Sequence, residues 1–201
     1  MSLLATWERK PRIAIDHAIA APGWADRTDD AQLQAFAHQI AARSYALDAD
    51  DATSRAHGRA ELERAEAAMD DNAADSIMYF NGRALLLSDH SKFFLQVGDP
   101  MSAAARAQVA LSLFDPSFVR LRAFATLELG TAHLQVGDVE HAATLIGDAI
   151  ELSARNRSAR LMEEVKDTLH GMDKWNDVQA VRALKERYHS LATGSRTRQS
   201  L

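Results

Sequence analysis

The chain has 201 residues, of which 38 are alanine and none is cysteine, and its formal net charge is −5. The absence of cysteine excludes disulfides, zinc–cysteine sites and thiol catalysis and favours a cytoplasmic location, while the negative charge disfavours binding to nucleic-acid phosphates. The apolar runs are far shorter than the roughly 20 residues of a membrane span, and abundant alanine favours helix over sheet, so we expect an all-α protein without a membrane segment.

The first expected element is a partial repeat over residues 3–22. Within it, Pro11 is followed by alanines at the same spacing that follows Pro100 later in the chain, so residues 11–21 are predicted to be the second helix of a hairpin. The first helix of that hairpin is missing except for residues 3–9. Proline followed by glycine, at Pro22 and Gly23, is expected to end the helix.

An end helix without its partner should expose an apolar face, because each repeat normally buries the open side of its neighbour. The residues expected on this face are Trp7, Ile13, Ile15 and Ile19. We therefore expect a homodimer through the N-terminal helix, since two-fold dimers are the commonest closed assemblies. The alternative is that residues 3–9 fold back as a short cap and the chain stays monomeric.

Four complete helix hairpins are expected to follow, over residues 29–70, 76–114, 117–153 and 156–192, with a flexible tail over residues 193–201. Each consists of two stretches with apolar residues at three- and four-residue intervals. Together with the partial repeat they form one predicted domain over residues 1–192.

An internal repeat supports this division. The pentapeptide Leu-Gln-Val-Gly-Asp occurs at residues 95–99 and again at residues 134–138, an offset of 39 residues, and the same offset leads on to Asn176 and Asp177. Glycine ends a helix cheaply because it adopts the left-handed conformation, and aspartate then caps the next helix. The pattern predicts a tight turn between two helices in each copy.

Residues 123–156 resemble the tetratricopeptide repeat. They place Leu129 and Gly130, His133 in the aromatic position, and then Gly137 and Asp138 at that family's spacing. The resemblance is weaker over residues 84–117, where Ser91 replaces the helix-packing glycine, and only the frame persists over residues 162–191. It implies a right-handed α-solenoid of about nine helices. Because the usual period is about 34 residues, the extra residues are expected in the connector around Asp115.

A narrower resemblance links residues 77–191 to the C-terminal part of actinobacterial regulators that carry an N-terminal helix-turn-helix of the Xre type and a C-terminal tetratricopeptide array. The segments that carry it are residues 78–81, 113–120, 157–160 and 177–181. Asn81 departs from that pattern, because an acidic residue is usual there. Nothing in residues 1–76 is typical of a DNA-reading helix-turn-helix, so this chain is not expected to bind DNA specifically.

The sequence contains no pattern typical of an enzyme, and we expect neither a cofactor nor a bound metal. None of its eight histidines is three or four residues from another, which is the spacing that would place two ligands on one helix face. His133 and His141 share one hairpin with Asp138, but we interpret His133 as filling the aromatic position and His141 as solvated.

In a tetratricopeptide solenoid the first helix of each hairpin lines a concave groove. The family frame places eight residues on this groove: Gln39, Arg43, Ser88, Lys92, Leu127, Thr131, Lys166 and His170. Cationic, amide and hydroxyl groups suit an extended peptide or its carboxylate. We therefore expect a non-enzymatic protein- or peptide-binding and oligomerisation module, the sensor part of a transcriptional regulator without its DNA-binding part. The alternative is a free-standing scaffold that bridges cytoplasmic proteins.

Overall fold

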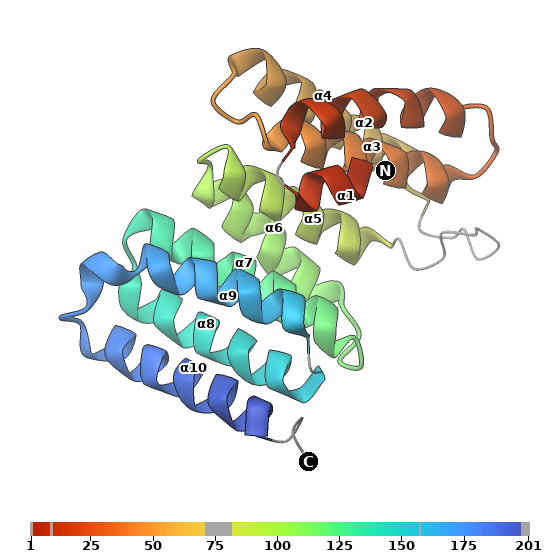
Figure 1. Cartoon of the computed structure of the whole chain (residues 1–201). Coiled ribbons are helices and arrows are strands. Elements are labelled where there is room, and N and C mark those ends of the chain that lie inside the picture. The colour runs from red at the N-terminus through yellow and green to blue at the C-terminus, as the bar shows by residue number, and fades with distance from the viewer. Residues whose placement is uncertain (1, 9, 71–81, 157, 198–201) are drawn as a thin grey trace. The chain divides into compact units, whose positions relative to one another are not determined.

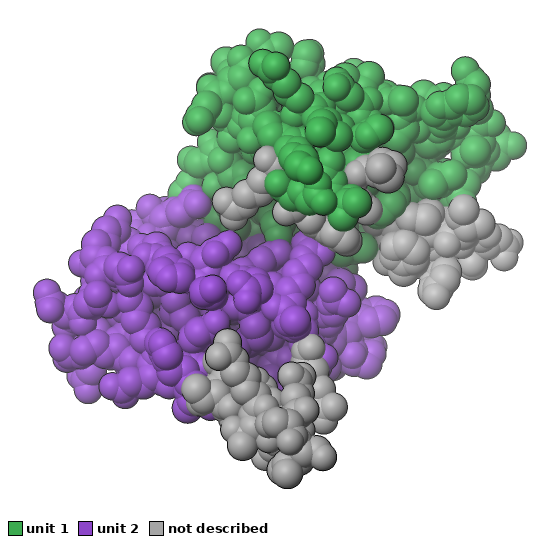
Figure 2. Space-filling model, in the orientation of Figure 1, with its two compact units in different colours: residues 1–113 green, residues 114–201 purple. Residues whose placement is uncertain are grey.

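The structure is a computed structural model that describes residues 2–8, 10–70, 82–156 and 158–197 (Figure 1). The chain divides into two compact units, residues 1–113 and 114–201 (Figure 2). Helices make up 83% of the described residues, which include no strand. The predicted all-α class is confirmed.

The described residues of unit 1 form six helices, and their order along the chain is that of a capped pair of hairpins. These are α1 (Ser2–Trp7), α2 (Pro11–Ala25), α3 (Ala31–Ala46), α4 (Ala52–Ala68), α5 (Arg83–Gln96) and α6 (Pro100–Leu113). The most extensive contacts join α3 to α4 and α5 to α6, and α5 also packs against both helices of the preceding hairpin. Two pairs of packed helices, α3 with α4 and α5 with α6, therefore lie in this part of the chain.

Alanine and glycine let the helices of unit 1 approach closely. Ala35, Ala42 and Ala65 are fully buried between helices, and they pack around larger side chains such as Leu86 and Phe93. Gly58 of α4 faces the ring of Phe93 so closely that a methyl group on Gly58 would overlap it. The small residues thus bring α4 against α5, and the Phe93 ring fills the remaining space.

The N-terminal end differs from the prediction in two ways. First, the described residues form ten α-helices where about nine were expected, and one of them is the short helix α1. Helix α1 packs on α2 and α3, as in the alternative of a short cap. The Ser2 hydroxyl donates to the carbonyl of Ala14 at 3.0 Å and lies 2.9 Å from the hydroxyl of Ser44. Second, α2 does not end at Pro22. Proline removes one helical hydrogen bond, but the next turn is still closed by the Asp26 N–H, which donates to the Pro22 carbonyl at 2.8 Å.

Unit 2 is built around one long hairpin. Its elements are α7 (Val119–Val136), α8 (Val139–Asn156), α9 (Ala159–Gly171), a 3₁₀ helix (Asp173–Trp175) and α10 (Gln179–Thr197). Helix α9 packs against both α7 and α8, whereas α10 packs chiefly against α8. The core between these helices includes Leu127, Ile146, Ile150, Leu161, Val165 and Val181.

The end of unit 2 also departs from the expected boundaries. Helix α10 continues to Thr197, so the tail expected from residue 193 begins inside a helix. Residues 198–201 lie outside the described part of the chain, as do residues 78–81 and Arg157, which carry part of the resemblance to the regulators.

The two repeated glycine–aspartate turns have the predicted geometry. Gly98 and Gly137 have φ angles of 76° and 88°, the left-handed conformation that ends a helix. After the first turn, the Asp99 carboxylate accepts the Ser102 N–H at 3.2 Å at the start of α6. The connector around Asp115, where extra residues were expected, spans residues 114–118 between α6 and α7.

Candidate functional site

The four predicted groove residues of unit 1 lie on α3 and α5, and the structure uses most of them to hold these helices together. Gln39 and Ser88 are buried. Arg43 Nη1 lies 3.5 Å from Asp89 Oδ1, and both side chains are only 14% exposed. Lys92 is half-buried. The prediction therefore needs correction for Gln39 and Ser88, whose side chains face neighbouring helices rather than solvent.

The four predicted groove residues of unit 2 lie on α7 and α9 and fall into two groups. Leu127 belongs to the hydrophobic core, and the half-buried Thr131 donates its hydroxyl to the Leu127 carbonyl at 2.8 Å. Lys166 and His170 are exposed and one helical turn apart on α9, where His170 Nδ1 donates to the Lys166 carbonyl at 2.9 Å. Of these four residues, only Lys166 and His170 have exposed side chains.

Unit 1 also buries charged groups that the sequence analysis did not single out. His38 Nδ1 of α3 lies 2.6 Å from Glu61 Oε2 of α4. Burial alone would raise the pKa of Glu61, but the hydrogen bond and charge of His38, together with the charge of Arg64, outweigh it and hold that pKa below its usual value. This pair bridges the two helices of one hairpin.

A second polar cluster links α4, α5 and α6. His90 Nδ1 lies 3.2 Å from Glu66 Oε1, and Arg106 Nη1 lies 2.8 Å from the same oxygen. Burial of the imidazole, aided by the positive charge of Arg106, lowers the pKa of His90 to about 3. Burial dominates because His90 is 2% exposed while Glu66 is 34% exposed and screened by water. His90 is therefore a neutral ring at physiological pH.

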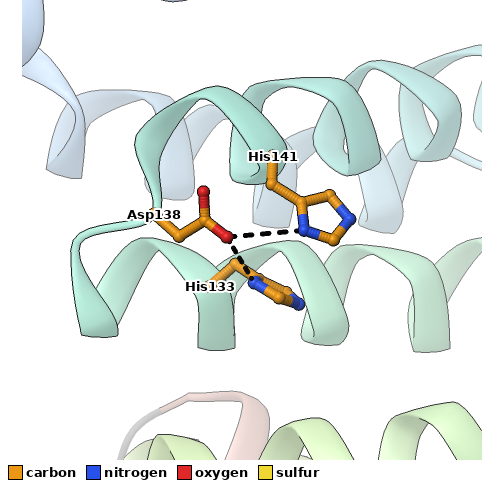
Figure 3. A group of neighbouring side chains, drawn as sticks. All are labelled: His133, Asp138 and His141. Atoms are coloured by element: carbon orange, nitrogen blue, oxygen red, sulfur yellow. Dashed lines mark hydrogen bonds and ion pairs between the residues drawn. The ribbon is translucent and has the colours of Figure 1, made fainter.

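The clearest cluster of chemically capable side chains lies at the turn between α7 and α8 (Figure 3). His133 comes from the last turn of α7, Asp138 from the turn itself, and His141 from the first turn of α8. Asp138 Oδ2 lies 3.1 Å from His133 Nδ1 and 3.5 Å from His141 Nδ1. The two imidazole rings lie side by side, with their centroids 4.1 Å apart.

The local fold explains why these three residues meet. Gly137 ends α7 in the left-handed conformation, so that α8 folds back along α7. Gly130 allows the two helices to approach, because a methyl group there would lie 2.9 Å from Ile146 Cγ1 and 3.2 Å from the Ile146 backbone nitrogen. His133 and His141 are therefore neighbours across the hairpin, although eight residues separate them.

The sequence places His133, Asp138 and His141 in one hairpin, but no two histidines fall on one helix face, so these residues are not predicted to form a site. In the structure the His133 ring lies beside the ring of His141, whose side chain is 51% exposed. The Gly–Asp turn itself was the available signal. In a tight helix hairpin, the residue five positions before the aspartate of this turn and the residue three positions after it come close together. Here these residues are His133 and His141.

Among the described residues, no helix is both long enough and apolar enough to cross a membrane. Comparison of the chain with models of protein families, with curated proteins and with solved structures finds no match. The case for its function therefore rests on its own sequence and structure.

Proposed function

We propose that the chain is a non-enzymatic helical-repeat module that binds a protein or peptide. The observation that carries this proposal is the packing order inside each unit. The first helix of one hairpin contacts the first helix of the next element, α3 with α5 in unit 1 and α7 with α9 in unit 2. This neighbour-to-neighbour stacking is the arrangement by which α-solenoids build binding surfaces.

The side chains available to a partner are fewer than the sequence analysis expected. Lys166 and His170 on α9 are exposed, and Lys92 on α5 is half-buried. Cationic and imidazole groups one helical turn apart suit an acidic or carboxylate-ending peptide, because the attraction is electrostatic and the lysine stem is long enough to adapt. We therefore propose that the peptide-contacting surface is on α9, at Lys166 and His170.

The module is proposed to be the sensor part of a transcriptional regulator. Support comes from the short motifs within residues 113–120 and 177–181, which resemble those regulators. In that role the DNA-reading element would belong to another segment, and this chain would report the presence of its partner.

The proposal can be tested by selecting binders from a peptide library displayed with free carboxyl termini. We expect enrichment of one related set of peptides, whose Kd rises about tenfold for the Lys166→Glu variant, a change of about 1.4 kcal/mol. The matched control is Arg182→Glu on α10, which makes the same change in net charge on an exposed position of a helix that packs chiefly against α8, and it should leave the Kd unchanged. Failure to enrich any peptide set, or equal effects of both variants, would contradict the proposal.

A further inference from the structure

We propose that His133, Asp138 and His141 form a binding site for a divalent transition-metal ion, with zinc as the favoured occupant. The three residues each offer one ligand atom, and these atoms all lie within 4.8 Å of one another. Two imidazoles and a carboxylate are a donor set that zinc accepts, with water completing the coordination. This site is independent of the peptide-binding surface proposed above.

The distances suit a tetrahedral ion. Ligand atoms at about 2.0–2.1 Å from a tetrahedral zinc lie about 3.3 Å from each other. The distances from Asp138 Oδ2 to His133 Nδ1 and His141 Nδ1 are 3.1 Å and 3.5 Å, on either side of that value. All three ligand atoms lie within 4.8 Å of one another, so the side chains would have to adjust to bring both nitrogens and the oxygen to this spacing around one ion.

Nδ1 is the nitrogen through which each imidazole would coordinate the ion, because Nδ1 of both rings faces the Asp138 carboxylate (Figure 3). A ligand nitrogen must offer its lone pair, so each ring would coordinate as a neutral imidazole. Nε2 of His133, in contrast, is buried and has no hydrogen-bond partner among the described groups.

Access to the site is open. Asp138 and His141 are 48% and 51% exposed, and Gln135, Val136 and Gly137 around the turn are exposed as well. An ion can therefore enter from solvent, and exposure gives two of the three ligands freedom to adjust.

The internal repeat provides a comparison within the same chain. Thirty-nine residues before the cluster, the equivalent turn has Phe94, Asp99 and Ser102 in place of His133, Asp138 and His141. Both copies have the aspartate, and its role at the turn is visible in the first copy, where the Asp99 carboxylate accepts the Ser102 N–H at the start of α6. The histidine pair is confined to the second copy, and turn formation does not account for it.

The site can be tested by titrating zinc into the full, tag-free chain and measuring the heat of binding by calorimetry. We expect one zinc ion per chain, and a rise in Tm with zinc concentration because the ion binds only the folded hairpin. The variants His141→Ala and Asp138→Asn should each weaken binding at least about tenfold and abolish the rise in Tm. Asparagine is as good a helix cap as aspartate, so the second variant keeps the turn while removing the charge.

Two matched control variants are available, one in the equivalent turn of the first repeat copy and one on α2. Asp99→Asn alters the corresponding turn of the first copy, and His17→Ala removes an exposed histidine of α2, so both should bind zinc as the unmodified chain does. Circular dichroism verifies that each variant is folded. The proposal is overturned if the unmodified chain binds no zinc, if folded His141→Ala binds it equally well, or if His17→Ala loses binding to the same extent.

Discussion

Two buried histidines of unit 1 lie beside carboxylates in different ways. His38 shares a short hydrogen bond with Glu61, whose pKa is lowered, whereas burial holds His90 neutral with a pKa of about 3. Glu61 and His90 both lie between helices of one unit, so the protonation of these two groups is linked to the stability of that unit.

His90 predicts a loss of stability in mild acid. In the unfolded chain the imidazole takes up a proton below its usual pKa of 6.5, but in the folded chain it does not do so until about pH 3. The unfolded state then binds the additional proton, so the free energy of unfolding from this group should fall by about 1.4 kcal/mol for each pH unit below 6.5. Urea titrations at pH 5, 6 and 7 measure the slope.

The His90→Gln variant should show a shallower dependence on pH than the unmodified chain over the same range. His17→Gln on exposed α2 is the control and should keep the original slope. Identical slopes for the His90→Gln variant and the unmodified chain would show that His90 is not held neutral.

Glu61 predicts an effect at lower pH. Because its pKa is lowered in the folded chain, its contribution to stability is complete above the usual value of 4.5 and is lost as pH falls through the folded-state pKa. The Glu61→Gln variant should lose about 1–3 kcal/mol of unfolding free energy at pH 7, since a hydrogen bond involving a charged group is replaced. The difference from the unmodified chain should shrink in acid. A difference that stays constant down to pH 3 would contradict this account.

At the scale of the elements, glycine determines how closely α7 approaches α8. A methyl group at Gly130 would lie within 3.2 Å of Ile146 and Leu145 atoms in the facing helix. Gly130→Ala should therefore destabilise the chain by about 1–3 kcal/mol through overpacking. Gly171→Ala, at the end of α9 where nothing lies within 4 Å of the added methyl, should be neutral or slightly stabilising. Thermal unfolding of both variants measures the contrast, and equal Tm values would contradict the close packing.

The helices and turns could be read from the sequence because their signals are local. Apolar spacing predicts α3 and α4, and the glycines at residues 98 and 137 predict the ends of α5 and α7. Pro22 was expected to end its helix, because proline removes a helical hydrogen bond. That local rule takes no account of tertiary packing, and in the structure Pro22 is buried within α2, which continues to Ala25. Local signals are thus reliable for forming a helix and weaker for ending it.

The candidate sites were harder to predict because they depend on which side chains meet across helices. Gln39 and Ser88 have the polarity of groove residues, but the packing of α3 and α5 buries them. The sequence places His133, Asp138 and His141 in one hairpin, but how close their side chains come depends on the closure of the turn and the approach of α7 to α8. Partners across an interface are set by tertiary packing rather than by spacing in the chain.

At the scale of the whole molecule, the expected dimer depends on the apolar residues of the N-terminal helices. Ile13 and Ile19 of α2 are 48% and 58% exposed, Ile15 is half-buried, and the side chain of Trp7 lies outside the described part. Helix α1 packs on α2 as a short cap, so among the described side chains of the expected apolar face only Ile13 and Ile19 remain exposed. If these two residues are covered by a second copy, the dimer has twice the mass of 22.1 kDa, whereas the cap alone predicts a monomer. Light scattering across dilution should show that dimer, and a double variant of Ile15→Asp with Ile19→Asp should be a folded monomer. A monomeric mass for the unmodified chain at tens of micromolar contradicts the prediction.

The net charge of −5 makes a second prediction at this scale. Because phosphate binding requires clustered cationic groups, the isolated chain should show no sequence-specific affinity for duplex DNA at physiological salt. Fluorescence anisotropy with labelled duplexes measures this. Specific binding there would place the DNA-reading element within this chain.

The central claim is that the chain binds a peptide through the first helices of its hairpins. Hydrogen–deuterium exchange on the chain, with and without the peptide enriched from the library, tests it most directly. The account predicts slowed exchange in α9, which carries Lys166 and His170, and unchanged exchange in α4, α6 and α8. Slowed exchange confined to α4, α6 and α8 would contradict it.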